Sequence, residues 1–90
     1  MTVYILTKTI FESWNYPQVH TNFKGAYDSI EKAWKAIEHD YYPLLTIIDE
    51  LEYTIKDVRI DATGLAISYE NFVKDHYYKE TFYIETVEVQ

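Results

Sequence analysis

One stretch of the chain repeats apolar side chains at every third or fourth position, which is the period of an α-helix with one buried face. The repeat consists of Ile30, Ala33, Trp34, Ile37 and Tyr41. Asp28 is the predicted N-cap, and Glu31 stands where a capping box places its acidic residue. A helix with a single apolar stripe must pack against another layer, so the rest of the chain has to supply that layer.

The apolar spacing continues beyond a proline, at Leu44, Ile48, Leu51 and Ile55. A proline inside a helix loses one hydrogen bond and clashes with the preceding turn, which costs about 3 kcal/mol. We therefore expect a break at Tyr42-Pro43, with Pro43 in the first turn of a second short helix that extends to about Glu52. Two alternatives stay open: residues 44–48 form a buried strand, or the whole stripe forms a dimeric coiled coil.

The first quarter of the chain has the composition of two paired strands. Residues 2–12 are rich in β-branched and aromatic side chains and are apolar on both faces, so we expect an interior strand. Residues 13–17 contain asparagine and proline and predict a loop. Residues 19–24 then return antiparallel to the first strand, which completes a hairpin.

The last third has the pattern of a β-meander. Residues 57–61 and 65–69 alternate polar and apolar side chains on either side of a tight turn at 62–64. Residues 70–75 either extend the second of these strands or form a loop. Residues 78–89 predict a long final strand.

Together these elements predict an α+β fold. The expected architecture is an antiparallel sheet of about five strands, in the order β-β-α-(α)-β-β-β, with helix packed on one face. Ninety residues are too few for two separate cores, so residues 1–90 are expected to form a single domain. The uncovered sheet face is expected to be mostly solvated, and the surplus among the ten tyrosines is predicted to lie there.

The charge and the lack of cysteine argue against several classes of protein. With 15 acidic and 8 basic residues the net charge is −7, so we expect no direct binding to nucleic acid or to an anionic membrane. Without cysteine the chain has no disulfide, no thiolate metal site and no cysteine nucleophile. No apolar run approaches the roughly 20 residues of a membrane span, and no targeting signal is evident, so a cytoplasmic location is expected.

The sequence contains no pattern of catalytic or cofactor-binding residues. No two of the histidines His20, His39 and His76 share a helical turn, so no metal site is predicted. Gly25 and Gly64 are isolated, which argues against a glycine-rich phosphate or dinucleotide loop. No serine or threonine stands in a glycine-framed elbow. We therefore predict no catalytic residue, no cofactor and no enzymatic activity.

Negative charge is concentrated in the middle of the chain. Residues 28–61 carry nine acidic and four basic residues, whereas residues 1–27 carry two lysines and one glutamate. Such a field attracts a basic partner surface, and it also serves as an ordinary solvated face that keeps a small protein soluble. Both interpretations stay open at this point.

Two groups of side chains are the predicted partner-binding residues. Trp14 and Tyr16 are aromatic residues near the tip of the first hairpin, and Asp49, Glu50 and Glu52 are a group of acids after the predicted break. An aromatic anchor beside a charged rim is how small protein interfaces gain energy and orientation. Packing of Trp14 over the sheet is the competing explanation for that residue.

Three segments resemble a recurring pattern. They are the opening strand Val3–Thr7, the helix start Lys24–Trp34 and the closing strand Phe82–Glu85. The pattern is similar to that of small uncharacterised proteins of phages and low-GC Gram-positive bacteria, with residues 43–76 as an insertion. The resemblance covers about a third of the chain and supplies no catalytic residue. It implies a phage or mobile-element accessory protein, a class that commonly binds and inhibits a host or defence protein.

These observations lead to one functional hypothesis and two alternatives. The first is a small acidic non-enzymatic protein-binding module, acting in the host cytoplasm as a phage inhibitor of a host defence or nucleic-acid-handling protein. The second is a structural homo-oligomer, such as a homodimer, that pairs through an edge left by the first and last strands or through a tyrosine-rich face. The third is a protein that sequesters a small ligand between sheet and helix.

Overall fold

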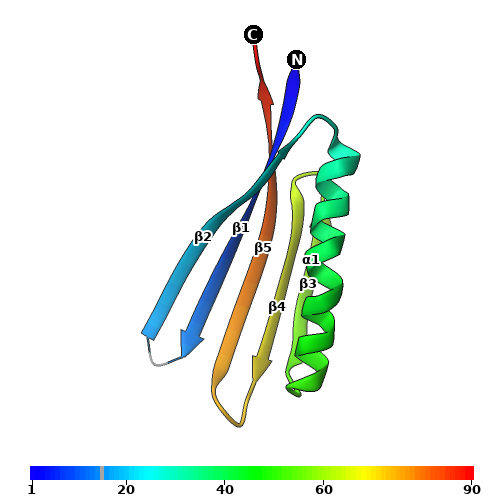
Figure 1. Cartoon of the computed structure of the whole chain (residues 1–90). Coiled ribbons are helices and arrows are strands. Elements are labelled where there is room, and N and C mark those ends of the chain that lie inside the picture. Colours follow the sequence, from blue (N-terminus) through cyan, green and yellow to red (C-terminus); the bar gives the residue numbers. More distant parts are fainter. Residues whose placement is uncertain (15) are drawn as a thin grey trace.

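A computed structural model describes the chain at residues 1–14 and 16–90, and the side chains of Trp14 and Tyr16 lie outside what it describes. Its elements are β1 (Thr2–Trp14), β2 (Tyr16–Tyr27), α1 (Ile30–Glu50), β3 (Thr54–Asp61), β4 (Gly64–Asn71) and β5 (His76–Glu88). The five strands form one antiparallel sheet, and α1 packs on one of its faces (Figure 1). The predicted α+β fold is confirmed.

The strand order is β2-β1-β5-β4-β3, so β1 and β5 lie in the middle of the sheet. The expectation that residues 2–12 form an interior strand is therefore confirmed. The expectation that the first and last strands leave a free edge is wrong, because each of them is hydrogen-bonded on both sides. The edges are β2 and β3 instead.

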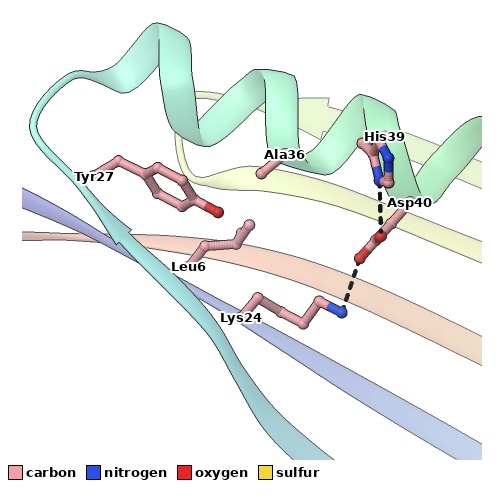
Figure 2. A pocket seen from close by; sticks show the side chains of 6 residues that line it. All are labelled: Leu6, Lys24, Tyr27, Ala36, His39 and Asp40. Carbon is pink, nitrogen blue, oxygen red and sulfur yellow. Dashed lines mark ion pairs between the residues drawn. The ribbon is translucent and has the colours of Figure 1, made fainter.

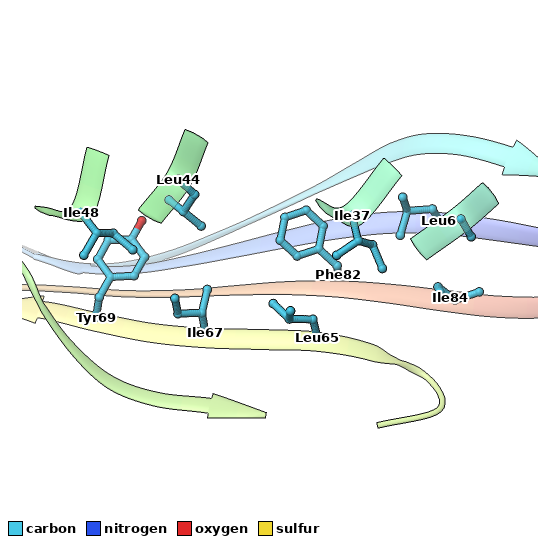
Figure 3. Close-up of a cluster of buried hydrophobic side chains, with 10 residues drawn as sticks. Leu6, Ile37, Leu44, Ile48, Leu65, Ile67, Tyr69, Phe82 and Ile84 are labelled. Atoms are coloured by element: carbon cyan, nitrogen blue, oxygen red, sulfur yellow. The ribbon is translucent and has the colours of Figure 1, made fainter. Parts of the chain in front are cut away.

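The core lies between α1 and the three central strands. Its most deeply buried large side chains are Phe82, Leu6, Ile37 and Ile67, each no more than 1% exposed. Figure 3 shows side chains of α1 facing those of β1, β4 and β5 across this layer. Burial of one such side chain contributes roughly 1.5–3 kcal/mol, so this single layer supplies most of the stabilisation.

The helix continues through its proline, which corrects the predicted break at Tyr42-Pro43. One helix spans residues 30–50 with Pro43 inside it. Leu44 and Ile48 beyond the proline are buried on the same stripe as Ile37, and their burial offsets the roughly 3 kcal/mol that the proline costs. Pro43 itself lies on the exposed side of the helix. Water can therefore hydrate the carbonyl that has no amide partner.

Both alternatives for this segment are wrong as well. Residues 44–48 are helical and not a strand. The stripe packs on the chain's own sheet, and Ile55 belongs to β3, so the apolar repeat does not continue as a coiled coil.

The helix begins one residue later than predicted. Its N-cap is Ser29, whose Oγ accepts a hydrogen bond from the backbone N–H of Lys32 at 3.3 Å. Asp28, the predicted N-cap, instead makes an ion pair with Lys32 at 2.8 Å. Either residue type caps a helix, and the sequence alone did not separate these neighbouring candidates.

The hairpins are tighter than the sequence indicated. Ser13 and Pro17, which were expected in a loop, are paired residues of β1 and β2. Residues 72–75 form the turn between β4 and β5, so the loop alternative for 70–75 applies to most of that segment. The turn between β3 and β4 needs Gly64, because its φ is 141° and a Cβ there would collide with the Phe82 carbonyl.

Most tyrosines lie on the helix side of the sheet, which contradicts the expectation that the surplus lies on the uncovered face. Those packed against or within the core are Tyr4, Tyr27, Tyr41, Tyr53, Tyr69 and Tyr78. A small domain with one helix gains core area from large aromatic rings, and the hydroxyl groups reach the margin of the core. Tyrosine is therefore a core-building residue in this chain.

Candidate functional site

The C-terminal end of α1 is closed by a Schellman motif. The backbone N–H of Tyr53 donates to the carbonyl of Ile48 at 2.9 Å, and that of Glu52 donates to the carbonyl of Asp49 at 3.1 Å. Glu52 has a φ of 59°, the left-handed conformation that this position requires. Glycine is the usual residue there, so a glutamate is strained by about 1 kcal/mol.

A pocket opens beside this helix end. Its volume is about 230 Å³, and its lining residues are Ile47, Ile48, Leu51, Tyr53, Tyr69 and Tyr78. Ile47 and Leu51 are 50% and 54% exposed, although both are large aliphatic side chains. We call this cavity the tyrosine pocket.

The three tyrosines of the tyrosine pocket form one aromatic cluster. The Tyr69 and Tyr78 rings stack with centroids 5.2 Å apart, and Tyr53 meets them edge-on at 5.5 and 5.7 Å. The Tyr53 hydroxyl lies 3.1 Å from Nδ1 of His76, which extends the cluster toward the β4–β5 turn. These contacts hold the walls of the pocket in place.

Two hydroxyls in this cluster, those of Tyr69 and Tyr78, are held in the neutral form. Burial, and then the hydrogen bond to the Glu80 carboxylate, raise the pKa of Tyr69 far above its usual value. Burial, and then the neighbouring Tyr53, raise the pKa of Tyr78 to about 12. The Tyr69 and Tyr78 hydroxyls are therefore uncharged at neutral pH, and the pocket offers aromatic faces with hydroxyl groups.

The predicted acidic residues Asp49, Glu50 and Glu52 are all exposed at this same helix end. The last turn of α1 contains no basic residue. Acidic side chains at a helix C-terminus oppose the helix dipole, typically by 0.3–1 kcal/mol each. At all three positions, an acidic residue stabilises the helix end less than a neutral or basic residue would.

The other predicted site residues do not join this group. The backbones of Trp14 and Tyr16 pair at the far end of the β1–β2 hairpin, while their side chains lie outside the described residues. That end of the hairpin and the C-terminal end of α1 lie at the same end of the sheet but at opposite edges (Figure 1). The structure thus separates the aromatic and acidic groups that the sequence suggested as one interface.

A second groove runs along the other side of α1, above β1 and β2. A cavity of about 260 Å³ there is lined by Leu6, Lys24, Tyr27, Ala36, His39 and Asp40. Lys24 Nζ lies 3.0 Å from an Asp40 carboxylate oxygen, and His39 Nδ1 lies 3.7 Å from the other oxygen (Figure 2). Burial opposes ionisation of Asp40, but the hydrogen bond and charge of Lys24 outweigh it and lower the pKa.

Deeper in this groove lies a buried ion pair. Lys8 Nζ is 2.9 Å from Glu80 Oε1, and the Tyr69 hydroxyl donates to Glu80 Oε2 at 2.6 Å. Glu80 is only 4% exposed, and the Lys8 ammonium also lies 5.1 Å from the centre of the Phe82 ring. Each carboxylate here already has a cationic partner: the Lys24–Asp40 pair joins β2 to α1, and the Lys8–Glu80 pair joins β1 to β5.

The described part of the chain was searched for metal-binding clusters and for membrane-spanning helices. No group of three or more His, Cys, Asp or Glu residues is placed to hold a metal ion among residues 1–14 and 16–90. Within the same residues, no helix combines the length and apolar character that a membrane crossing requires.

Comparison of the chain with protein-family models, with curated proteins and with solved structures gave no match.

The sequence pointed to the acids but missed the pocket beside them. Tyr69 and Tyr78 are directly paired across β4 and β5. That pairing would have followed from a turn at 72–75, but the sequence left 70–75 open between strand and loop. Tyr53 was missed because its position depends on where α1 ends, and the predicted break at Pro43 obscured that end.

Proposed function

We propose that the protein is a small, acidic, non-enzymatic protein-binding module. Its tyrosine pocket receives a lysine or arginine side chain of a partner protein, and Asp49, Glu50 and Glu52 form the acidic rim around that side chain. The observation that carries the proposal is the pairing of an aromatic pocket with three acids at one helix end.

The chemistry of the pocket favours a long basic side chain. Its aliphatic walls, Ile47 and Leu51, suit the methylene stem of lysine or arginine. The aromatic faces of the tyrosines attract the cationic head group, and the acidic rim adds opposite charge. A cavity of about 230 Å³ accepts one such side chain.

The placement of the acids is a second line of support. Selection for stability alone favours lysine or arginine in the last turn of a helix and glycine at the position of Glu52. A chain that keeps three acids there accepts a loss of stability, and such departures from local preference concentrate at functional sites.

The pocket lining gives little basis for catalysis. Its aliphatic residues and its tyrosines, of which Tyr69 and Tyr78 have raised pKa values, provide binding walls, and the hydrogen bond between the Tyr53 hydroxyl and His76 joins two side chains of the aromatic cluster. The proposal therefore keeps the expectation that the protein is not an enzyme.

The narrower hypothesis concerns the partner. A host protein that handles nucleic acid has a basic surface, and the acidic rim would compete for it. Inhibition of such a host or defence protein in the host cytoplasm stays a prediction from the sequence resemblance. Trp14 and Tyr16 stay predicted contacts at the other edge of the sheet.

The test is a nuclear magnetic resonance titration of the isotope-labelled protein with a short synthetic peptide of alternating lysine and valine. A peptide with glutamine in place of lysine is the control ligand. We expect the lysine peptide to shift the resonances of residues 47–53, Tyr69 and Tyr78, and the glutamine peptide to leave them unchanged. Shifts spread evenly over the whole acidic surface would contradict a defined pocket.

A pair of charge-matched variants separates the site from the net charge. The triple variant Asp49→Asn, Glu50→Gln and Glu52→Gln is expected to lower affinity for the lysine peptide by about tenfold or more. The control variant Glu31→Gln, Glu38→Gln and Asp57→Asn removes the same charge from other exposed positions and is expected to have an effect of about twofold. An equal loss of affinity for the lysine peptide in both variants would contradict the proposal.

A further inference from the structure

The sheet face opposite α1 has an unusual composition over two of its strands. The register of β1 and β2 places on this open face the residues Val3, Ile5, Thr7, Thr9, Phe11, Ser13, Pro17, Val19, Thr21, Phe23 and Ala26. None of these described positions carries a charged side chain, although 26% of the chain is charged. We call this surface the uncharged face.

The charged residues of the same hairpin lie on the helix side. Lys8 and Glu12 alternate with the uncharged positions of β1, and Lys24 reaches Asp40 of α1 from the irregularity in β2. A two-layer protein usually places its polar residues on the solvated face of the sheet. In this hairpin the arrangement is reversed.

The uncharged face also exposes large apolar groups. Phe23 and Val19 are 68% and 62% exposed, and Phe11 packs edge-on against Tyr77 of β5 with ring centroids 6.1 Å apart. Exposed apolar side chains gathered on one uncharged sheet face of a small protein indicate a contact surface.

We propose that the uncharged face binds a second copy of this chain, so that two sheets pack face to face in a symmetric dimer with α1 on each outer side. Each copy carries a net charge of −7, which repels an identical copy. The uncharged face brings two copies together without placing like charges in contact. Together with the adjoining open side of β5, the area is also sufficient for a dimer.

The spacing and length of the strands set the area that each copy can bury. The uncharged face on β1 and β2 is about 10 Å wide and about 40 Å long, and the adjoining open side of β5 widens the surface to about 14 Å, which gives about 550 Å² per copy. Two copies then bury about 1,100 Å², just above the roughly 1,000 Å² that a specific interface needs. Packed sheets of this kind lie about 10 Å apart with strand directions rotated by about 30°.

The charges that border the uncharged face fit a twofold arrangement. Lys79 and Glu85 lie on the open side of β5, toward its two ends, and neither belongs to an ion pair among the described residues. In this arrangement a twofold axis passes near Phe82. It lies in the plane of the interface and is perpendicular to the strands, so β5 of one copy runs antiparallel to β5 of the other. Lys79 of each copy then faces Glu85 of the other copy.

The experiment is sedimentation analysis of the full chain over a range of concentrations. We expect the wild-type protein to dimerise, and Phe23→Lys to raise the dimer dissociation constant by at least about tenfold. Ile60→Lys is the matched control, because Ile60 is 64% exposed but lies on β3 and on the helix side. Circular dichroism checks that both variants keep the fold.

Charge reversal at the border gives a sharper test. Lys79→Glu and Glu85→Lys each place like charges opposite one another and are expected to weaken the dimer, whereas the double variant is expected to restore it. A chain that stays monomeric up to about 1 mM would overturn the proposal. A dimer that Phe23→Lys leaves intact, or that the double variant fails to restore, would overturn it equally. None of these outcomes depends on peptide binding at the tyrosine pocket.

Discussion

The two faces of the β1–β2 hairpin differ in a way that is the reverse of the usual pattern. On the side covered by α1, the hairpin carries Lys8 and Lys24, and both make ion pairs beneath the helix. On the uncovered side it carries aromatic, β-branched and hydroxyl side chains without charge. Burial of charge is unfavourable unless the charge is paired, and exposure of Phe and Val contributes nothing to the stability of a monomer.

Residues that stabilise the fold and residues that are available for contacts therefore lie on separate faces of the hairpin. The covered face holds the core and its paired charges, so substitutions there are expected to act on the free energy of unfolding. The open face has side chains whose removal should matter only when another molecule is present. Predictions can therefore compare matched residues on the two faces.

The largest expected difference is between two phenylalanines. Phe82 is 1% exposed in the core, whereas Phe23 is 68% exposed on the uncharged face. We expect Phe82→Ala to lower the free energy of unfolding by about 3–5 kcal/mol, and Phe23→Ala by no more than about 0.5 kcal/mol. Urea unfolding, at a protein concentration well below the dimer dissociation constant, measures both free energies. A comparable loss in both variants would mean that the open face belongs to the monomer core.

A smaller difference is expected between two lysines. Lys8→Met leaves the buried Glu80 carboxylate without its cation and should lower the free energy of unfolding by about 3 kcal/mol. Lys79→Met on the open face should change it by less than about 0.5 kcal/mol at the same dilution. The double variant Lys8→Met and Glu80→Gln keeps an acceptor for the Tyr69 hydroxyl and should recover most of the loss. A double variant as unstable as Lys8→Met alone would show that the lysine acts through packing and not through charge.

Sequence reasoning predicted the elements of this fold well where one periodicity decided the outcome. The alternation in β1 and β5 and the stripe from Ile30 to Ile37 identified strands, helix and core side. The predicted break at Pro43 was wrong. Proline disfavours a helix interior, but burial of Leu44 and Ile48 against the sheet favours continuation of the helix, and this tertiary contact is not visible in the sequence.

The candidate site was only partly predictable for a related reason. Asp49, Glu50 and Glu52 were identified from charge, which is visible in the sequence. The pocket beside them depends on contacts between Tyr53 of the α1–β3 connection, Tyr69 of β4 and Tyr78 of β5, and on the residue at which α1 ends. The uncharged face was also hidden, because it appears only when the register of β1 against β2 is known.

The smallest expected effect concerns the strained end of α1. Glu52→Gly relieves the left-handed conformation and should raise the free energy of unfolding by about 1 kcal/mol. It also removes one rim charge, so affinity for the lysine peptide should fall by about threefold. Thermal unfolding and the peptide titration measure the two effects on the same sample.

Asp75→Gly is the matched control for this change, because Asp75 is the other non-glycine residue with a positive φ, at 55°, among the described residues. It lies in the β4–β5 turn, outside the lining of the tyrosine pocket. Asp75→Gly should therefore stabilise the chain by a similar amount while peptide affinity stays unchanged. If both variants gain stability and neither loses affinity, Glu52 is a strained residue without a role in binding. In that case only Asp49 and Glu50 belong to the acidic rim.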